Sequence, residues 1–562
     1  MTSSNAIRLL SAISLTALLS PLQAQEHFEA LCDTTPWLMS RNVAGLCALP
    51  EGVRTNYAEA YFEGQKGGWC DYSQSSDSYQ FGARTASYFR VNEQLALSGS
   101  VSYDNFTGKN MTGSVWLHPE DQPFDIVEMN PASAGTKNRE TYQLTGALGY
   151  DFGPLQLGAG VDFTAANNAK RRDLRIQNKL TDLQATIGLT TSQPHDLTTS
   201  RPHDLITLGL SYTYRRTLEE LLFKTYGTTE TLYASLIDYG ASFGVSEYSN
   251  AGRLTDENEE RPLVTQRHTV SLQASLQLGQ AQWFNEGSLE WRSGYYGKHS
   301  LYTPVFMEHQ VHSWQYRGVL TWLGHHSLQY EVGGSHLRNF QNVYSYVNQG
   351  GGLNEYIYYG QLLTRSQRSL DAGLTYKYYR GSWLYRSSLA YHELRLTASN
   401  YPCYRQQTLR YYALALSALR QWHRGPHDWS VQLALVHQRG SGTMAHDGEY
   451  TSSTVVYESS TSDASPSVST AVSSSSAASS SISSSLSSGT VATLPAALQQ
   501  HYDYLTAPQG SLVLSLLYGR QLSHHPLRPF VRLDAHYQRA WSVTADVETH
   551  RQGLSLTAGC TF

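Results

Sequence analysis

The carboxy-terminal stretch Gly553 to Phe562 alternates apolar and polar residues along its whole length. Because successive side chains of a β-strand point to opposite sides, this pattern predicts a strand with one apolar and one polar face. The apolar face carries Leu554, Leu556, Ala558, Cys560 and Phe562, and the polar face carries Ser555, Thr557, Gly559 and Thr561. An ordinary amphipathic strand would show the same pattern, so other segments must decide what lies against the two faces.

The same alternation recurs along the chain. Clear further segments are Thr141–Asp151, Arg267–Gly279, Asp428–His437 and Pro529–Gln538. Each is about ten residues long, which is the length of a tilted strand that crosses a bilayer. Strands of soluble sandwiches are usually about 5–6 residues long. Segment length therefore favours a membrane-spanning sheet.

Short and long connections alternate between these segments. The short ones are Arg90–Gln94, Phe152–Pro154, Gly279–Phe284, Leu323–Ser327, Arg380–Ser382, His423–Asp428 and His524–Arg528. The long ones are Asn105–Glu140, Thr217–Gln266, Gly297–Val311, Asn339–Ser366 and Gly440–Gln509. Transmembrane barrels have short periplasmic turns and longer outer loops. We therefore expect an all-β, transmembrane, antiparallel up-and-down barrel.

We expect this barrel to have about 18 strands, with a range of roughly 14–20. It runs from Asn56–Phe62 to Gln552–Phe562, so that residues 56–562 form the barrel. Thr217–Gln266 is interpreted as one outer loop, although Leu232–Ser246 could supply another hairpin.

The amino-terminal residues 1–24 are typical of a secretory signal peptide. Arg8 precedes the apolar run Leu9 to Leu22, and cleavage is expected before Gln25. Residues 25–55 are expected to form a short periplasmic or luminal segment. Cys32 and Cys47 within it could form a disulfide or remain free thiols, and both alternatives stay open.

Two connections have unusual sequences. Thr190–Leu197 is repeated at once as Thr198–Leu205, and the Pro-His-Asp in each copy indicates a turn. Ser459–Ser488 is rich in serine, with Asp463 as its only charge, and has too few apolar residues to offset its conformational entropy. We expect a disordered outer loop at about 440–509.

Composition excludes several classes of protein. Hydrophobic residues make up 40% of the chain, and no interior run of 18 apolar residues could form a membrane-spanning helix. The net charge of −5 indicates no nucleic-acid partner. The 39 tyrosines are typical of barrels, in which aromatic residues lie at the membrane interfaces.

The chain carries no recognisable catalytic, cofactor-binding or metal-ligating motif. The pairs His427–Asp428 and His446–Asp447 are interpreted as turn or loop residues, so we expect no enzyme. The inward face is more informative. If Val531 and Leu533 face lipid, the residues that face the lumen are Arg532, Asp534, His536 and Gln538, and by the same phase Arg386, His392, Glu290 and Arg292. An interior of this kind is wet unless something plugs it; the alternative is a filled barrel.

Several features resemble an uncharacterised outer-membrane β-barrel protein family of Bacteroidota. They are the signal, the opening Pro36-Trp37 with Asn42 to Leu46, the Tyr-rich hairpins and the terminal Cys560-Thr561-Phe562. The resemblance implies a location in the bacterial cell outer membrane. The partners expected there are outer-membrane lipid and the barrel-insertion machinery, which would read the C-terminal strand.

Three functions fit these expectations. The first is a passive pore or transporter for small solutes, with the solute unknown. The alternative is a structural or surface-interaction barrel that partners an envelope or secretion complex. An outer-membrane hydrolase is the third.

Overall fold

The structure is a computed structural model that describes most of the chain after the amino-terminal segment. The described residues are 35–128, 133–191, 206–226, 234–241, 243–248, 254–255, 259–300, 303–350, 353–400, 403–443, 446–447, 494–522, 527–541, 543 and 548–562. The predicted signal peptide, the second copy of the eight-residue repeat and the serine-rich run lie outside these residues.

Eighteen antiparallel strands form a closed barrel in the described part of the chain, which confirms the predicted fold class and strand number. Each strand pairs with the next, and the first pairs with the last, with Tyr61 opposite Thr557. The strands are β1 (Arg54–Lys66), β2 (Asp77–Arg90), β3 (Leu95–Met111), β6 (Gly135–Asp151), β7 (Leu155–Lys170), β8 (Arg175–Thr191), β9 (Ile206–Lys224), β12 (Arg261–Leu278), β13 (Ala281–Gly297), β14 (Val305–Trp322), β15 (His326–Gly350), β16 (Leu353–Arg380), β17 (Trp383–Asn400), β18 (Cys403–Arg424), β19 (His427–Gly442), β21 (Gln509–Arg520), β22 (Arg528–Ala540) and β23 (His550–Thr561).

The side chains alternate between the two faces of the wall as predicted. On β19, Leu433 is 46% exposed on the outside, whereas its neighbour Gln432 is 7% exposed and points inward. On β22, Val531 is exposed and Arg532 is buried in the interior. The barrel therefore has an apolar outer wall and a polar inner wall.

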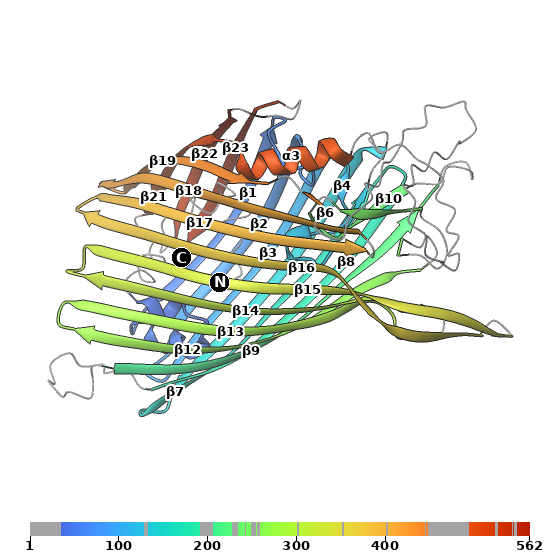
Figure 1. Ribbon diagram of the computed structural model, residues 1–562. Helices are drawn as coiled ribbons and strands as arrows, with labels where there is room; N and C mark the ends of the chain where they lie inside the picture. The colour runs from blue at the N-terminus through green and yellow to red at the C-terminus, as the bar shows by residue number, and fades with distance from the viewer. Residues whose placement is uncertain are drawn as a thin grey trace.

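The strands are longer than the ten-residue segments predicted, and two extend well past the rim. β15 and β16 have 25 and 28 residues and remain paired up to Gly350 and Leu353. The prediction of a loop at Asn339–Ser366 is therefore wrong, because its Tyr, Val and Ile residues favour a strand. Figure 1 shows this hairpin, here called the arm, protruding from one end of the barrel.

Two other predicted loops contain a second, smaller sheet. It has the strand order β11–β10–β5–β4. β4 (Gly113–Ser114) and β5 (Asp125–Glu128) come from the connection predicted at Asn105–Glu140. β10 (Ala234–Asp238) and β11 (Gly244–Tyr248) come from Thr217–Gln266, where the prediction of a plain loop is wrong and a hairpin forms.

The remaining elements are short. Three are 3-10 helices: η2 (Pro36–Met39), η3 (Val43–Ala48) and η4 (Pro119–Asp121). The predicted loop at 440–509 contains β20 (His446–Asp447), which pairs with β18, and α3 (Leu494–Thr506). Among the described residues, no helix is long and apolar enough to cross a membrane.

Candidate functional site: the barrel interior and its cap

The long-loop end of the barrel is covered from inside by elements that we call the cap: β4, β5, η4, β10, β11 and α3. The small sheet packs against the inner wall through an apolar cluster. Its own residues include Trp116, Phe124 and Ile237, and the wall contributes Phe223 from β9 and Leu396 from β17. All of these side chains are buried, so the small sheet shares one apolar core with wall strands from β9 to β17.

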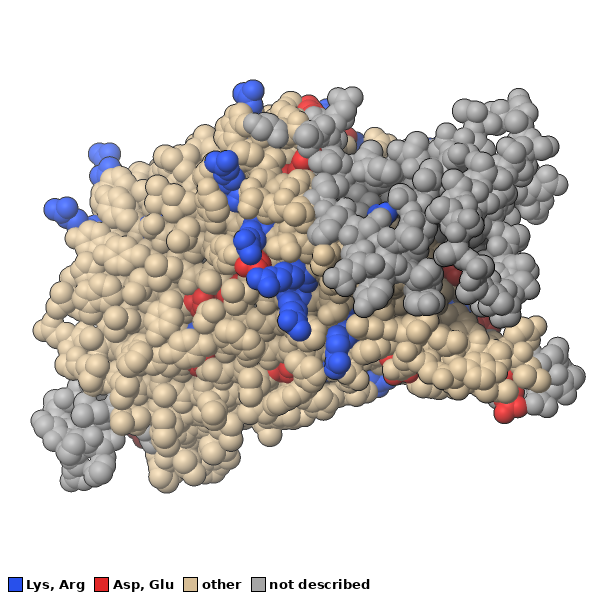
Figure 2. Space-filling view, in the orientation of Figure 1, with Lys and Arg blue, Asp and Glu red and all other residues tan. Residues whose placement is uncertain are grey.

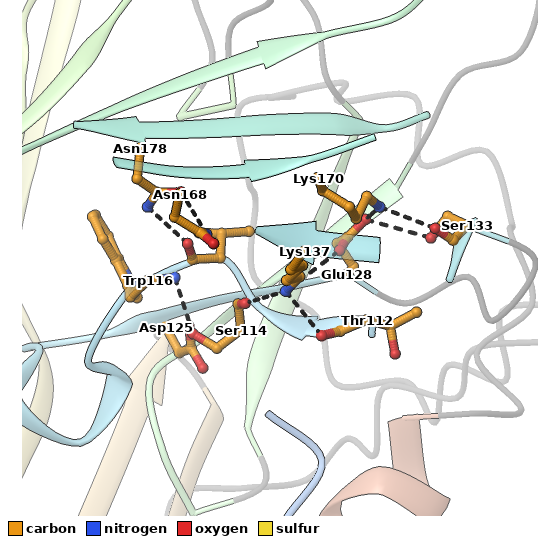
Figure 3. A network of polar contacts seen from close by, with 11 residues as sticks. Thr112, Ser114, Trp116, Asp125, Glu128, Ser133, Lys137, Asn168, Lys170 and Asn178 are labelled. Carbon is orange, nitrogen blue, oxygen red and sulfur yellow. Dashed lines mark hydrogen bonds and ion pairs between the residues drawn. The ribbon is translucent and has the colours of Figure 1, made fainter. Parts of the chain in front are cut away.

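A buried polar network fastens the β4–β5 hairpin to the wall (Figure 3). The Lys170 ammonium on β7 pairs with the Glu128 carboxylate, and both side chains are almost fully buried. Lys137 on β6 donates to the carbonyl oxygens of Thr112 and Ser114, at 3.0 and 2.8 Å. Buried charges of this kind persist only when they are paired and hydrogen-bonded. The network therefore fixes where the hairpin sits in the lumen.

A second network anchors the next turn of the same loop. Asn178 on β8 donates to the Val115 carbonyl oxygen at 2.8 Å and to Glu219 on β9 at 2.8 Å. The same Glu219 carboxylate accepts from the Leu117 amide at 2.9 Å. The loop is thus held to the wall by side chains of four neighbouring strands, β6 to β9.

Asp125 lies where four connections of the long-loop end meet. It accepts hydrogen bonds from Ser114 Oγ at 2.7 Å and from the Tyr72 hydroxyl at 3.0 Å. The Tyr72 ring packs edge-on against His501 of α3, whose Nδ1 lies 3.0 Å from Asp71. The 67–76 connection, the small sheet and α3 are therefore one connected structure.

Burial perturbs the acids and bases of this junction. Burial raises the pKa of Asp125 to about 7, and the neighbouring Asp238 carboxylate adds to the rise. Burial also raises the pKa of Asp238 itself, which the Arg365 guanidinium partly opposes. For His501, burial disfavours the charged form, but the Asp71 carboxylate outweighs it and the pKa is raised. The junction is therefore sensitive to pH near neutrality.

The amino-terminal segment, residues 35–50, fills part of the opposite, short-turn end; we call it the plug. Asn42 donates from Nδ2 to the carbonyl oxygens of Leu189 and Leu210, at 2.9 and 3.2 Å. The Arg41 amide donates to Glu286 at 2.8 Å. Glycines on four adjacent strands leave room for it, since a Cβ would meet the plug within 3.0 Å at Gly149, Gly158, Gly188 and Gly209. The described residues of the amino-terminal segment therefore contact the inner wall through both backbone and side chains.

Three arginines stand side by side on the inner wall between the cap and the plug. Arg215 on β9, Arg267 on β12 and Arg292 on β13 are directly opposite one another in register. Like charges in such positions repel. Arg215 is paired with Asp182 at 2.9 Å, and Arg292 donates to the Asp121 carbonyl oxygen of η4 at 3.2 Å.

Arg267 has no such partner among the described residues, and its buried Nε is unsatisfied. Glu290, which bonds Thr269, adds a carboxylate near the row. The row therefore combines three cations with nearby acids on the inner wall, and Arg267 at its centre has no partner among the described residues.

The inward residues named from sequence lie where they were expected. Arg532 and Asp534 form an ion pair at 2.9 Å, and His392 bonds Asp371 across β16 and β17. Arg386 also faces inward, and its Nε has no partner in the described structure. These groups line the lumen without converging on a catalytic geometry.

Neither of the two His-Asp pairs, His427–Asp428 and His446–Asp447, forms a catalytic arrangement in the described structure. His427 lies at a short turn, 2.8 Å from the Tyr518 hydroxyl, and Asp428 pairs with His423 rather than with His427. His446 and Asp447 form β20. No three His, Cys, Asp or Glu side chains gather as a metal site within the described ranges.

Sequence reasoning missed the cap and the arginine row. A signal for the cap exists in the strand ends at the long-loop side, where Leu221, Leu222 and Phe223 are consecutive. A wall that faced water on the inside would not carry apolar residues on both faces. The arginine row depends on strand register, which the sequence does not display.

A family model described as "Family of unknown function (DUF6850)" matches residues 43–562. Curated proteins gave no match. Similar solved structures include the outer membrane transporter YddB from Escherichia coli, with 8% identity, coverage of 90% of this chain and 80% of that chain, and a TM-score of 0.39.

Another is the FrpB iron transporter from Neisseria meningitidis, with 8% identity, coverage of 93% and 84%, and a TM-score of 0.41. With identity and TM-scores this low, neither likeness carries an inference about what this chain binds.

Proposed function

The chain belongs to the Family of unknown function (DUF6850), and we propose that this member is a bacterial outer-membrane barrel that passes small polar solutes through its lumen. The observation that carries the proposal is the contrast between the two faces of one closed wall. Outside, Leu433, Leu514 and Val531 are exposed; inside, Gln432, Ser515 and Arg532 on the same three strands are buried.

The apolar side chains on the outer face of the wall need a hydrocarbon environment. Exposed leucine, valine and aromatic side chains cover the wall, whereas a soluble monomer rarely exposes contiguous apolar patches larger than a few hundred Å². The wall is closed, so no backbone edge faces the surroundings, as a membrane demands. We infer that the short-turn end, where the plug and Phe562 lie, is periplasmic and that the cap and the arm are outside the cell.

The inner face supports passage of polar solutes. Ion pairs such as Arg532–Asp534 and Arg215–Asp182 line it on opposite sides. The cap and the plug lie in this path, so a static, wide-open pore is not the form we propose. Passage requires the solute to move around these elements or to displace them.

Conductance measurements test this function. The folded protein, identified by its altered electrophoretic mobility before heating, is inserted into planar bilayers, and single-channel currents are recorded. We expect small conductance steps in the wild type. A larger conductance is expected when residues 234–248 of the cap are replaced by a short Gly-Ser linker. Absence of current in both proteins, with folding intact, would overturn the transport proposal.

A surface-interaction barrel is the second candidate, and the arm is the observation that favours it. Its exposed side chains include Tyr346, Ile357 and Tyr359, and such apolar groups in water are typical of a contact surface. Shortening the arm to the rim should leave conductance unchanged and abolish co-purification of a stoichiometric envelope partner. Failure to capture any partner with the full arm would leave transport as the better account.

The C-terminal strand is proposed as the segment read by the barrel-insertion machinery. Its outward face carries Leu554 and Leu556, and Phe562 closes the seam by donating its amide to the Asn56 carbonyl oxygen at 3.1 Å. We propose no enzymatic activity. The hydrolase alternative would require a measured activity that is lost on replacing His427 or Asp428.

A further inference from the structure

The outer wall of the barrel carries a row of arginines that the proposed transport does not use. Arg368, Arg395, Arg410, Arg439 and Arg539 lie on β16, β17, β18, β19 and β22, and all five are exposed on the outward face. Figure 2 shows basic side chains in a row across the outer wall, next to the long-loop end. We call this row the belt.

Strand register makes the belt continuous from β16 to β19. Arg368 is directly opposite Arg395 across β16 and β17. Arg410 is opposite Glu393, one outward position away from Arg395, and Arg439 is opposite Tyr412, one outward position away from Arg410. From Arg368 to Arg439, each arginine is therefore a direct or diagonal neighbour of the next on the surface of the sheet. Arg539 lies one strand further on, because Gly510 of β21 stands between it and His437 of β19.

The belt marks the edge of the apolar wall. Going from the short turns towards the long loops, Leu374 and Leu370 are followed on the outward face of β16 by Arg368. On β22, Val531, Leu533 and Tyr537 precede Arg539 in the same way. In a membrane this boundary is the level of the lipid headgroups, where arginine can extend its charge out of the hydrocarbon.

Most of the belt's hydrogen-bond donors are unused within the described structure. Glu393 is the carboxylate among them, and it pairs with Arg395 at 2.7 Å and Arg410 at 3.4 Å. Arg368, Arg439 and Arg539 donate to no described residue. A guanidinium matches the geometry of a phosphate group and binds it with two parallel hydrogen bonds.

We propose that the belt binds phosphate groups of lipid headgroups in the leaflet at the long-loop end. The inference rests on the proposed membrane position of the barrel. Charge complementarity supports it: four net positive charges result from five arginines and one carboxylate, at the depth where lipid phosphates lie. Lipid binding at the belt would also fix the tilt and depth of the barrel.

The test uses a triple variant of the unpaired arginines, Arg368→Gln, Arg439→Gln and Arg539→Gln, because it breaks no described ion pair. The matched control is Arg380→Gln, Arg424→Gln and Arg520→Gln, three exposed arginines at the short turns. Each folded protein is titrated in neutral detergent with mixed micelles that contain phosphatidylglycerol, at low salt. Phosphatidylcholine micelles and inorganic phosphate are the comparison ligands.

We expect the belt variant to bind phosphatidylglycerol micelles roughly a hundredfold more weakly than the wild type, since each arginine near a charged surface contributes about fivefold. The control should bind as the wild type does. Equal binding by all three proteins would overturn the proposal, and so would an equal loss in the control. Competition by millimolar inorganic phosphate would also overturn it, because the site would then be one for free phosphate.

The two proposals fail in different ways. A barrel that enters phosphatidylcholine vesicles but shows no preference for phosphatidylglycerol refutes the belt alone. A chain that enters no vesicle refutes the membrane position itself.

Discussion

The side-chain oxygen of Asn42 occupies the space that a side chain at Gly188 would fill. A Cβ placed on Gly188 would lie 2.0 Å from Asn42 Oδ1, which is far inside van der Waals contact. The same oxygen accepts the Ala44 amide at 3.0 Å and so shapes the first turn of η3. Of the four glycines that make room for the plug, Gly188 is therefore the one that Asn42 approaches most closely.

We predict that Gly188→Val displaces the plug and leaves the barrel intact. Burial raises the pKa of the Cys47 thiol to about 11, so this thiol is protonated and shielded while η3 is docked. In a chain with Cys47 as its only cysteine, maleimide labelling at neutral pH should become at least tenfold faster in the variant.

Gly146→Val is the matched control for this labelling. Gly146 lies on β6, two strands away from Gly188 on β8, and a Cβ there would meet nothing within 4 Å. The control should label as slowly as the parent protein. If Gly188→Val also labels slowly, the plug is not held at this position.

A second prediction tests which face meets lipid. Leu433→Arg should impair membrane assembly, because a charged residue on the lipid side near mid-depth costs roughly 2–4 kcal/mol. Gln432→Arg should be tolerated, since Gln432 faces the polar interior. The yield of heat-modifiable protein in the membrane fraction measures both. Similar yields for the two variants would contradict the facing assignment.

The third prediction concerns the buried pair that fastens the cap. Glu128→Gln leaves the Lys170 ammonium without its carboxylate in a buried site, which typically costs about 3–5 kcal/mol. The 112–134 connection should then be cleaved much faster by protease, while the barrel still shows heat-modifiability. Removing an exposed pair is the control: Lys179 and Glu260 lie 2.7 Å apart at the surface, and Glu260→Gln should cost roughly 0–1 kcal/mol.

The barrel could be predicted from the sequence because apolar and polar residues alternate, one by one, along each strand of its wall. Leu433 and Gln432 are assigned to their faces by alternation alone, and the order of short and long connections gives the strand number. These signals are local, so they need no knowledge of which strands are neighbours.

The interior could not be predicted in the same way. Arg267 meets Arg215 and Arg292 only through the register of three strands, and Glu128 meets Lys170 across 42 residues. The arm was missed because its many tyrosines were assigned to a loop on the strength of the expected strand length. The expected strand length was only what is needed to cross a bilayer. β15 and β16 remain paired well past that length.

A fourth prediction follows from the raised pKa of Asp125. In the unfolded cap this carboxyl titrates near its usual value of about 4, and in the folded cap burial raises the pKa to about 7. Between these values the folded cap binds more protons, so the stability of the cap should fall as pH rises from about 4 to about 7 and change little above that.

His501 adds to this dependence with the same sign, since its raised pKa stabilises the cap at low pH and the effect is lost as pH rises. Protease cleavage within 112–134, corrected for the protease's own pH profile, measures the effect. Asp125→Asn should flatten the slope between about pH 4 and 7. A cap that resists cleavage better at higher pH would contradict this assignment.

The last prediction is that ions crossing the barrel pass beside the row formed by Arg215, Arg267 and Arg292. Arg215 is paired with Asp182 and Arg292 donates to the Asp121 carbonyl oxygen, whereas Arg267 at the centre of the row has no partner among the described residues. Replacing it with glutamate changes the charge of the inner wall by two units at this position, and fixed charges that line a passage alter local ion concentrations about tenfold or more. In a salt gradient, the reversal potential of Arg267→Glu should therefore shift strongly towards cation selectivity. Arg424→Glu, at an exposed short turn, should leave the reversal potential nearly unchanged. If both variants conduct and neither shifts, ions pass on the far side of the lumen, away from β9, β12 and β13.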